Sequence, residues 1–109
     1  MAGGIERGQI RLVRFPAPDK SRPVLVLTRS SAIAYLSRVT VAPITSTIRD
    51  VPSEVLVGPG DGLKQPSAVN LHNVVTVEKA VIGRRVAQLD EGKMRDVCRA
   101  LGFALGCDA

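Results

Sequence analysis

The apolar residues of this chain fall into short runs separated by polar or turn-forming residues, and this spacing constrains the fold most strongly. The runs are rich in Val, a β-branched residue that packs well on a pleated sheet. Short strands at such close spacing favour a small barrel or a strongly curved sheet. We expect strands over residues 9–15, 24–28, 39–44, 51–57, 68–69, 74–77 and 81–86.

A chain of 109 residues suits one compact domain, and we expect a single domain over residues 1–109. Hydrophobic residues make up 45% of the chain and aromatic residues only 3%, so the core must be built from aliphatic side chains. Residues 29–37 are ambiguous between a loop and one helical turn with Tyr35 and Leu36 inward.

The C-terminal stretch has helical rather than strand periodicity. Asp90 suits the N-cap of this helix and Gly106 suits its end. Gly102 weakens a helix, so we expect it to serve a close contact between helix and sheet. The predicted inward face consists of Met94, Val97, Cys98, Leu101 and Leu105.

The formal net charge of +5 favours a polyanionic partner such as a nucleic acid, because a basic surface displaces phosphate counterions. The alternative is that the arginines only solvate the surface, and charge alone does not decide between the two. One Tyr and two Phe argue against an aromatic platform that stacks single-stranded bases.

Several classes of chemistry are disfavoured by what the sequence lacks. Cys98 and Cys107 give neither a disulfide framework nor a paired metal site. His72 is the only histidine, so a metal held by imidazoles is not expected. No glycine-rich phosphate loop precedes a helix, and we expect no metal and no cofactor. Without a long apolar run or a signal peptide, the chain is expected to be cytoplasmic.

Arg22 and Thr45 stand at the ends of two predicted strands. If these strands pair antiparallel, the start of one lies beside the end of the other, and both side chains can face one cleft. A guanidinium beside a hydroxyl suits a phosphodiester, because the guanidinium binds two phosphate oxygens and stabilises developing charge. The alternative is that Arg22 is an ordinary solvated residue at a sheet edge.

Four stretches and the final helix resemble, in order, the MazF/PemK/Kid toxins. The opening stretch is similar to their Arg-Gly-(Asp/Glu)-(Ile/Val) strand, the second to their Arg-Pro-(Val/Ala)-Val-Val strand, and the third to their (Val/Ala)-Pro-(Ile/Cys)-Thr-(Ser/Thr) turn. The fourth resembles a later segment that ends in an acidic or amide residue and Gln or Asn. The matching stretches are Ile5 to Ile10, Arg22 to Leu27, Ala42 to Ser46 and Ser67 to Asn73, followed by the helix led by Leu89 and Asp90.

The resemblance implies a mainly β fold (α+β), a small SH3-like barrel of the CcdB/MazF type with a C-terminal α-helix. It also implies a homodimer, an acidic cognate antitoxin and cleavage of single-stranded RNA, which is mRNA, rRNA or tRNA. The catalytic Arg and Thr of the family fall on Arg22 and Thr45. The expected substrate contacts are Asp19, Lys20, Ser46, Thr47, Asn70 and Asn73.

The chain departs from the family pattern at two places. Residues 16–21 are short and lack the Gly-Ser-Glu-Gln stretch of many members. Where several members have Asp in the later segment, this chain has His72, and histidine is a residue type that often serves as a general base. The alternative for His72 is a surface or packing residue.

The implied reaction is attack of the RNA 2′-hydroxyl on its own phosphorus, giving a 2′,3′-cyclic phosphate and a 5′-hydroxyl. Arg22 would stabilise the charge on phosphorus and is a candidate proton donor to the leaving oxygen, while Thr45 would bond a phosphate oxygen. The alternatives are a non-catalytic gyrase poison of the CcdB type and a plain SH3-like binding module.

Overall fold

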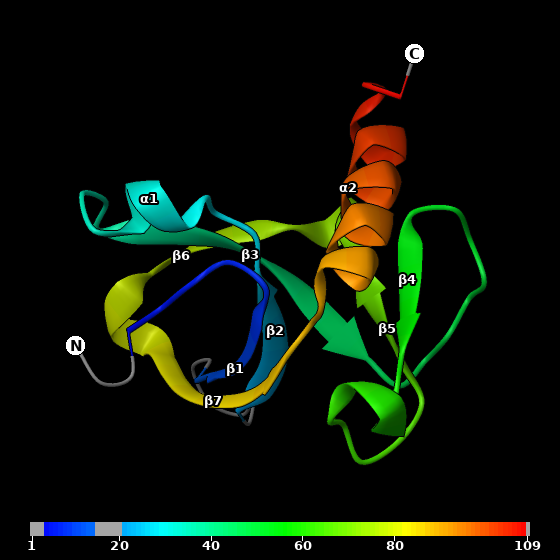
Figure 1. Cartoon of the computed structure of the whole chain (residues 1–109), viewed down its shortest axis with the longest axis horizontal. Coiled ribbons are helices and arrows are strands. Elements are labelled where there is room, and N and C mark those ends of the chain that lie inside the picture. The colour runs from blue at the N-terminus through cyan, green and yellow to red at the C-terminus, as the bar shows by residue number, and fades with distance from the viewer. Residues whose placement is uncertain (1–3, 15–20, 109) are drawn as a thin grey trace.

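A computed structural model describes residues 4–14 and 21–108. In this part of the chain, seven antiparallel strands form one curled sheet in the order β4-β5-β3-β2-β1-β7, with β6 paired to β3 (Figure 1). The strands are β1 Gln9–Val13, β2 Arg22–Val26, β3 Arg38–Thr45, β4 Glu54–Val57, β5 Ser67–Asn70, β6 Val75–Glu78 and β7 Ile82–Gln88. The helices are α1 Ser30–Ile33 and α2 Glu91–Leu105, and the 3-10 turns are η1 Pro59–Asp61, η2 Leu71–Asn73 and η3 Lys79–Val81.

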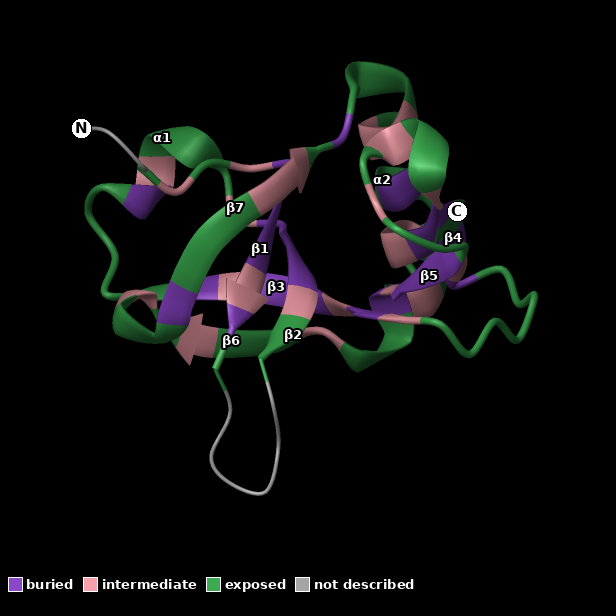
Figure 2. Ribbon diagram, turned by 90° about the horizontal axis from the view of Figure 1, so that it is seen from below, coloured by how far each residue is buried: buried purple, intermediate pink, exposed green. Residues whose placement is uncertain are grey.

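The central strands β2 and β3 are buried on both faces, which explains why they are Val-rich rather than alternating. On one face, Val24, Val26, Val39 and Val41 pack in a cluster that includes Ile82 of β7. On the other face, a second cluster includes Leu25 and Ala42 of these strands and Val97 of α2. Figure 2 shows buried residues concentrated on these inner strands and exposed residues on β7 and α1.

Strand β3 belongs to two ladders. Its first half pairs with β6, where Val41 lies opposite Val75, and its end pairs with β5, where Ile44 lies opposite Val69. Turn η2 separates the two ladders and lies beside Pro43. Proline has no N–H, so it is tolerated inside a strand where no ladder bond is required. The break at Pro43 therefore joins the curled half of the sheet to the β4–β5 half.

Strand β7 bends around β1 through two register shifts. At Gly83 the backbone of β1 comes so close that a Cβ would lie 3.0 Å from the carbonyl oxygen of Leu12. The Arg11 guanidinium donates to the Gly83 carbonyl at 2.7 Å and to the Gln9 side chain at 2.9 Å. Burial and the nearby charge of Arg85 lower the pKa of Arg11. The bulged stretch is thus fixed by a buried side chain of the neighbouring strand.

Helix α2 begins and ends as the sequence predicts. The Asp90 carboxylate accepts the backbone N–H of Lys93 at 2.8 Å, and Gly106 adopts the left-handed conformation that ends the helix. Val97 is buried, and Met94 and Leu101 pack against the core.

The predicted face of α2 is wrong in part. Cys98 and Leu105 are exposed, and Ala100 is buried instead. The buried face of α2 is narrower than the predicted one, because the helix packs mainly against β4 and η2. The Gly102 interpretation is also wrong, since a Cβ there would meet Asp108 of the returning C-terminal segment at 3.9 Å rather than the sheet.

The inward residues predicted between β2 and β3 are wrong. Tyr35 is 89% exposed and Leu36 is 44% exposed, whereas Ile33 is buried in the α1 turn. Helix α1 is a single turn, so one apolar residue suffices to anchor it.

Neither α1 nor α2, the helices of the described residues, has the length and the apolar character that a membrane span requires.

Candidate active site

Arg22 and Thr45 belong to the same end of the β2–β3 pair. The register pairs Val26 with Val41 and Val24 with Pro43, where the ladder ends. Arg22 and Thr45 are the residues two positions beyond that last pair, one on each strand. Beyond Pro43, Thr45 pairs with Ala68 of β5.

Both side chains project from the same face of the sheet. Successive side chains alternate along a strand, so Arg22 shares its face with Val24 and Val26. Thr45 shares the same face through Val39 and Val41. Arg22 is exposed and Thr45 is half-buried at the rim of this cluster. The strands thus carry Arg22 and Thr45 to the same end and the same face of the sheet.

The Thr45 hydroxyl is oriented by the chain that follows it. Its oxygen Oγ1 accepts the backbone N–H of Thr47 at 3.1 Å. A hydroxyl that accepts one bond retains its proton as a donor. The Thr45 hydroxyl can therefore donate to a phosphate oxygen held by Arg22.

His72 lies on the other side of β3, in turn η2. Its ring nitrogen Nδ1 is hydrogen-bonded to the Ser53 hydroxyl, and its backbone N–H donates to Asn70 Oδ1 at 3.2 Å. With Nδ1 engaged, Nε2 is the nitrogen left to exchange a proton with a ligand. The residue is exposed, which suits contact with a substrate. Its ring contacts Ser53 rather than Thr45, so the structure brings Arg22 and Thr45 together and leaves His72 one strand away.

The remaining predicted contacts divide into three groups. Ser46 and Thr47 follow Thr45 and are exposed, as is Asn73. Asn70 is half-buried, and its side chain caps the η2 turn by accepting the His72 N–H. Asp19 and Lys20 lie outside the described residues. The sequence did not indicate Ser53, whose bond to His72 joins positions 19 residues apart.

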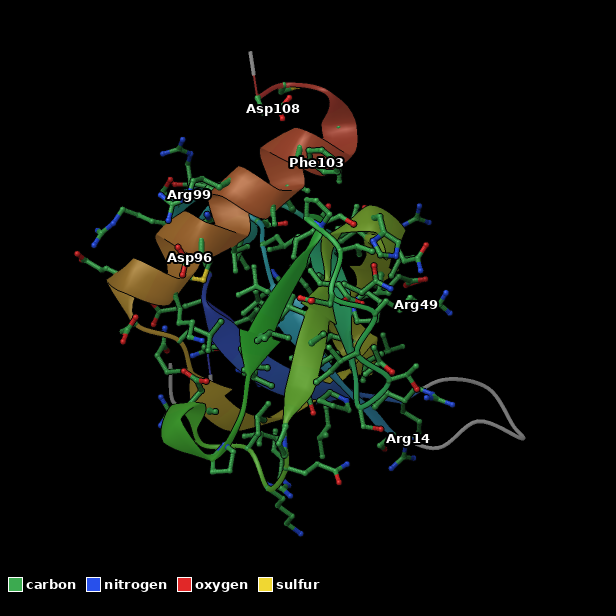
Figure 3. All side chains as sticks on the ribbon, turned by 90° about the vertical axis from the view of Figure 1, so that its right-hand side faces the viewer. Arg14, Arg49, Asp96, Arg99, Phe103 and Asp108 are labelled. Carbon is green, nitrogen blue, oxygen red and sulfur yellow. The ribbon has the colours of Figure 1, made fainter. Side chains whose placement is uncertain are left out.

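Two further arginines, Arg14 and Arg49, lie in the segments that follow β1 and β3 and were not identified from the sequence. Arg14 follows Val13, whose partner across β1 and β2 is Arg22. Arg49 lies in the segment after β3. Figure 3 labels Arg14 and Arg49, whose side chains point outward. Only the strand register reveals that Arg14 neighbours Arg22.

The described residues contain no group of three or more His, Cys, Asp or Glu that could hold a metal ion. The chemistry that they offer is an exposed guanidinium and an oriented hydroxyl at this end of the sheet, with an exposed imidazole one strand away.

Comparison with known protein families matches residues 6–105 to PemK-like, MazF-like toxins of type II toxin–antitoxin systems. The chain belongs to this family. The match spans nearly all of the sequence and includes Arg22, Thr45 and His72. The family expected from the sequence motifs is confirmed.

Individual relatives agree with the family match. The probable endoribonuclease MazF5 of Mycobacterium tuberculosis is 47% identical over 87 residues, 79% of this chain and 80% of that protein. The structure of the Mycobacterium tuberculosis toxin MazF-mt6 superposes with a TM-score of 0.85 and 38% identity, covering 93% of this chain and 99% of that one. An endoribonuclease from a mycobacterial species, solved with its cognate antitoxin, has a TM-score of 0.83 and 26% identity, covering 94% and 96%. The predicted MazF-type fold is confirmed.

Proposed function

We propose that this chain is the endoribonuclease toxin of a type II toxin–antitoxin pair. We propose further that it cuts single-stranded RNA with Arg22 at the start of β2 and Thr45 at the end of β3. The observation that supports the proposal is the antiparallel β2–β3 register, because it brings the start of β2 and the end of β3 to the same end of the sheet. Relatives named as endoribonucleases support RNA as the substrate class. We propose that residues 1–109 form one toxin domain.

The reaction uses groups that the RNA and the protein already hold. The 2′-oxygen forms a bond to phosphorus while the bond from phosphorus to the 5′-oxygen breaks. The 2′-proton passes to a base, and the 5′-oxygen takes up a proton to become a hydroxyl. Arg22 stabilises the negative charge on the phosphoryl oxygens, and Thr45 donates to one of them. DNA has no 2′-hydroxyl and is not cut.

The positive charge around Arg22 and Thr45 suits a nucleic acid strand. Arg14 follows β1, Arg49 lies in the segment after β3, and the chain carries a net charge of +5. We propose that these arginines and the polar residues Ser46, Thr47 and Asn73 contact the RNA backbone and bases near the cut. A gyrase poison or a plain binding module would not require a guanidinium and a hydroxyl in fixed register.

The test is cleavage of a long single-stranded RNA by purified protein in excess EDTA. We expect cuts that leave 2′,3′-cyclic phosphate and 5′-hydroxyl ends, because the nucleophile belongs to the substrate. Matched RNA with 2′-O-methyl groups at the cut sites should remain intact. Loss of cleavage in EDTA with recovery in Mg²⁺ would contradict this mechanism.

His72 is proposed as the base that accepts the 2′-proton. We expect His72→Ala to lower kcat/KM by about 100-fold, the lower end of the range for a lost general base and of the loss expected for Arg22→Ala. The measurement is kcat/KM of the parent and the variant under the same conditions. If His72→Ala retains the parent rate, the base lies elsewhere.

We also propose a homodimer and inhibition by an acidic antitoxin that folds on binding, both in the cytoplasm, where RNA is present. The related endoribonuclease solved with its cognate antitoxin supports such a partner. A basic surface attracts an acidic segment and orients it. Light scattering should give twice 11.6 kDa for the toxin alone. A monomer at micromolar concentration would refute the dimer.

A further inference from the structure

Glu54, at the start of β4, has an unusual role for a half-buried carboxylate. Its oxygen Oε1 accepts two successive backbone N–H groups, from Arg49 at 3.0 Å and from Asp50 at 2.9 Å. Its other oxygen, Oε2, is buried and has no hydrogen-bond partner among the described residues. A carboxylate oxygen left in this state is costly, so the bonds at Oε1 must compensate for it.

The segment that Glu54 holds is the 46–50 loop, which follows β3. Asp50 adopts a left-handed conformation with φ of 57°, which is unfavourable for a residue with a side chain. Two successive N–H groups that point to one side form a site for an anion. Glu54 supplies that anion from within the chain, and it offsets the cost of the Asp50 conformation.

The same loop orients the Thr45 hydroxyl through the backbone N–H of Thr47. Glu54 therefore fixes one end of a five-residue loop, and Thr47 transmits its position to Thr45 at the other end. Glu54 also follows Ser53, which bonds His72, and it pairs across the β4–β5 ladder with Asn70, which caps the His72 turn. The Glu54 carboxylate thus lies between the 46–50 loop, which bonds Thr45, and turn η2, which carries His72.

We infer that Glu54 is a positioning residue for RNA cleavage: its carboxylate holds the 46–50 loop so that the Thr45 hydroxyl points at the phosphate. This inference rests on the proposed function and extends it to a residue that does not touch the substrate. Charge-assisted bonds are about twice as strong as neutral ones. The negative charge is therefore required, in addition to the shape of the side chain.

The first measurement needs no RNA. In Glu54→Gln, we expect the backbone amides of Thr47, Arg49 and Asp50 to exchange hydrogen at least tenfold faster than in the parent, while amides of β2 and β3 keep their protection. Glu91→Gln is the matched control, since Glu91 is an exposed carboxylate in the first turn of α2. Unchanged exchange in the 46–50 loop of Glu54→Gln would overturn the inference.

The second measurement couples Glu54 to Thr45. We expect Glu54→Gln to lower kcat about tenfold with KM within twofold of the parent, because misplaced catalytic groups slow the reaction more than they weaken binding. Glu54→Gln combined with Thr45→Ala should be no slower than Thr45→Ala alone.

Additive effects in this double variant would show that Glu54 does not act through Thr45 and would overturn the inference. If Glu54→Gln fails to fold, Glu54→Asp, which keeps the charge but shortens the reach, replaces it in both measurements. If the parent cuts no RNA, the proposed function fails, and the exchange rates alone decide whether Glu54 holds the loop.

Discussion

Arg22→Ala is expected to lower kcat/KM for RNA cleavage by about 100- to 1000-fold, the usual effect of removing one donor that stabilises transition-state charge. Arg22 is an exposed residue at the start of β2, so the variant should lose about 1 kcal/mol or less of unfolding free energy. The measurements are single-turnover cleavage rates and urea unfolding of the same preparations.

Arg22→Lys separates charge from shape at this position. An ammonium group keeps the charge but cannot form two parallel bonds to a phosphate, so we expect little recovery. Arg38→Ala is the matched control, because Arg38 is also an exposed arginine that opens a strand. Near-parental cleavage by Arg22→Ala would refute the site and favour a non-catalytic poison.

Thr45→Val is expected to slow cleavage by about 100-fold, because it removes one hydrogen-bond donor to the phosphate while preserving the shape of the side chain. Thr45→Ser keeps the hydroxyl and should retain most of the rate. Losing the bond from Thr47 N–H should cost about 1 kcal/mol of unfolding free energy. Rates and urea midpoints of both variants provide the comparison.

Thr40→Val controls for the loss of a hydroxyl from β3. The Thr40 hydroxyl bonds that of Thr76 at 2.9 Å, five residues before Thr45 on the same strand. Its removal should alter stability slightly and leave cleavage unchanged. If Thr45→Ser is as slow as Thr45→Val, the Thr45 hydroxyl does not act as a donor.

The strands and the C-terminal helix were predictable because their signals are local. Val-rich runs identify β2 and β3, and Asp90 and Gly106 bound α2 within the chain itself. The buried face of α2 was less predictable. Cys98 and Leu105 follow helical spacing but are exposed, because the width of the contact depends on which strands the helix meets.

In the candidate site, too, local sequence signals were predictable and contacts between distant segments were not. Arg22 and Thr45 follow from motifs at strand ends, and their juxtaposition follows from antiparallel pairing. The roles of Ser53 and Glu54 could not be predicted, because each depends on how a loop returns to a distant strand. Arg14 and Arg49 were missed for the same reason. Side chains that hold a loop or another side chain, as Glu54 and Ser53 do, follow no periodic pattern in the sequence.

Arg22 and Thr45, at the ends of β2 and β3, separate the catalytic groups from the loops that contact the rest of the RNA. The positions of the two residues along the sheet are set by main-chain pairing between two buried strands, whereas the 46–50 loop sets only the orientation of the Thr45 hydroxyl. Connecting segments tolerate substitution far better than a buried sheet does. We therefore expect that exchanging the exposed loops of this chain changes the RNA sequence that it recognises while Arg22 and Thr45 keep their places in the sheet.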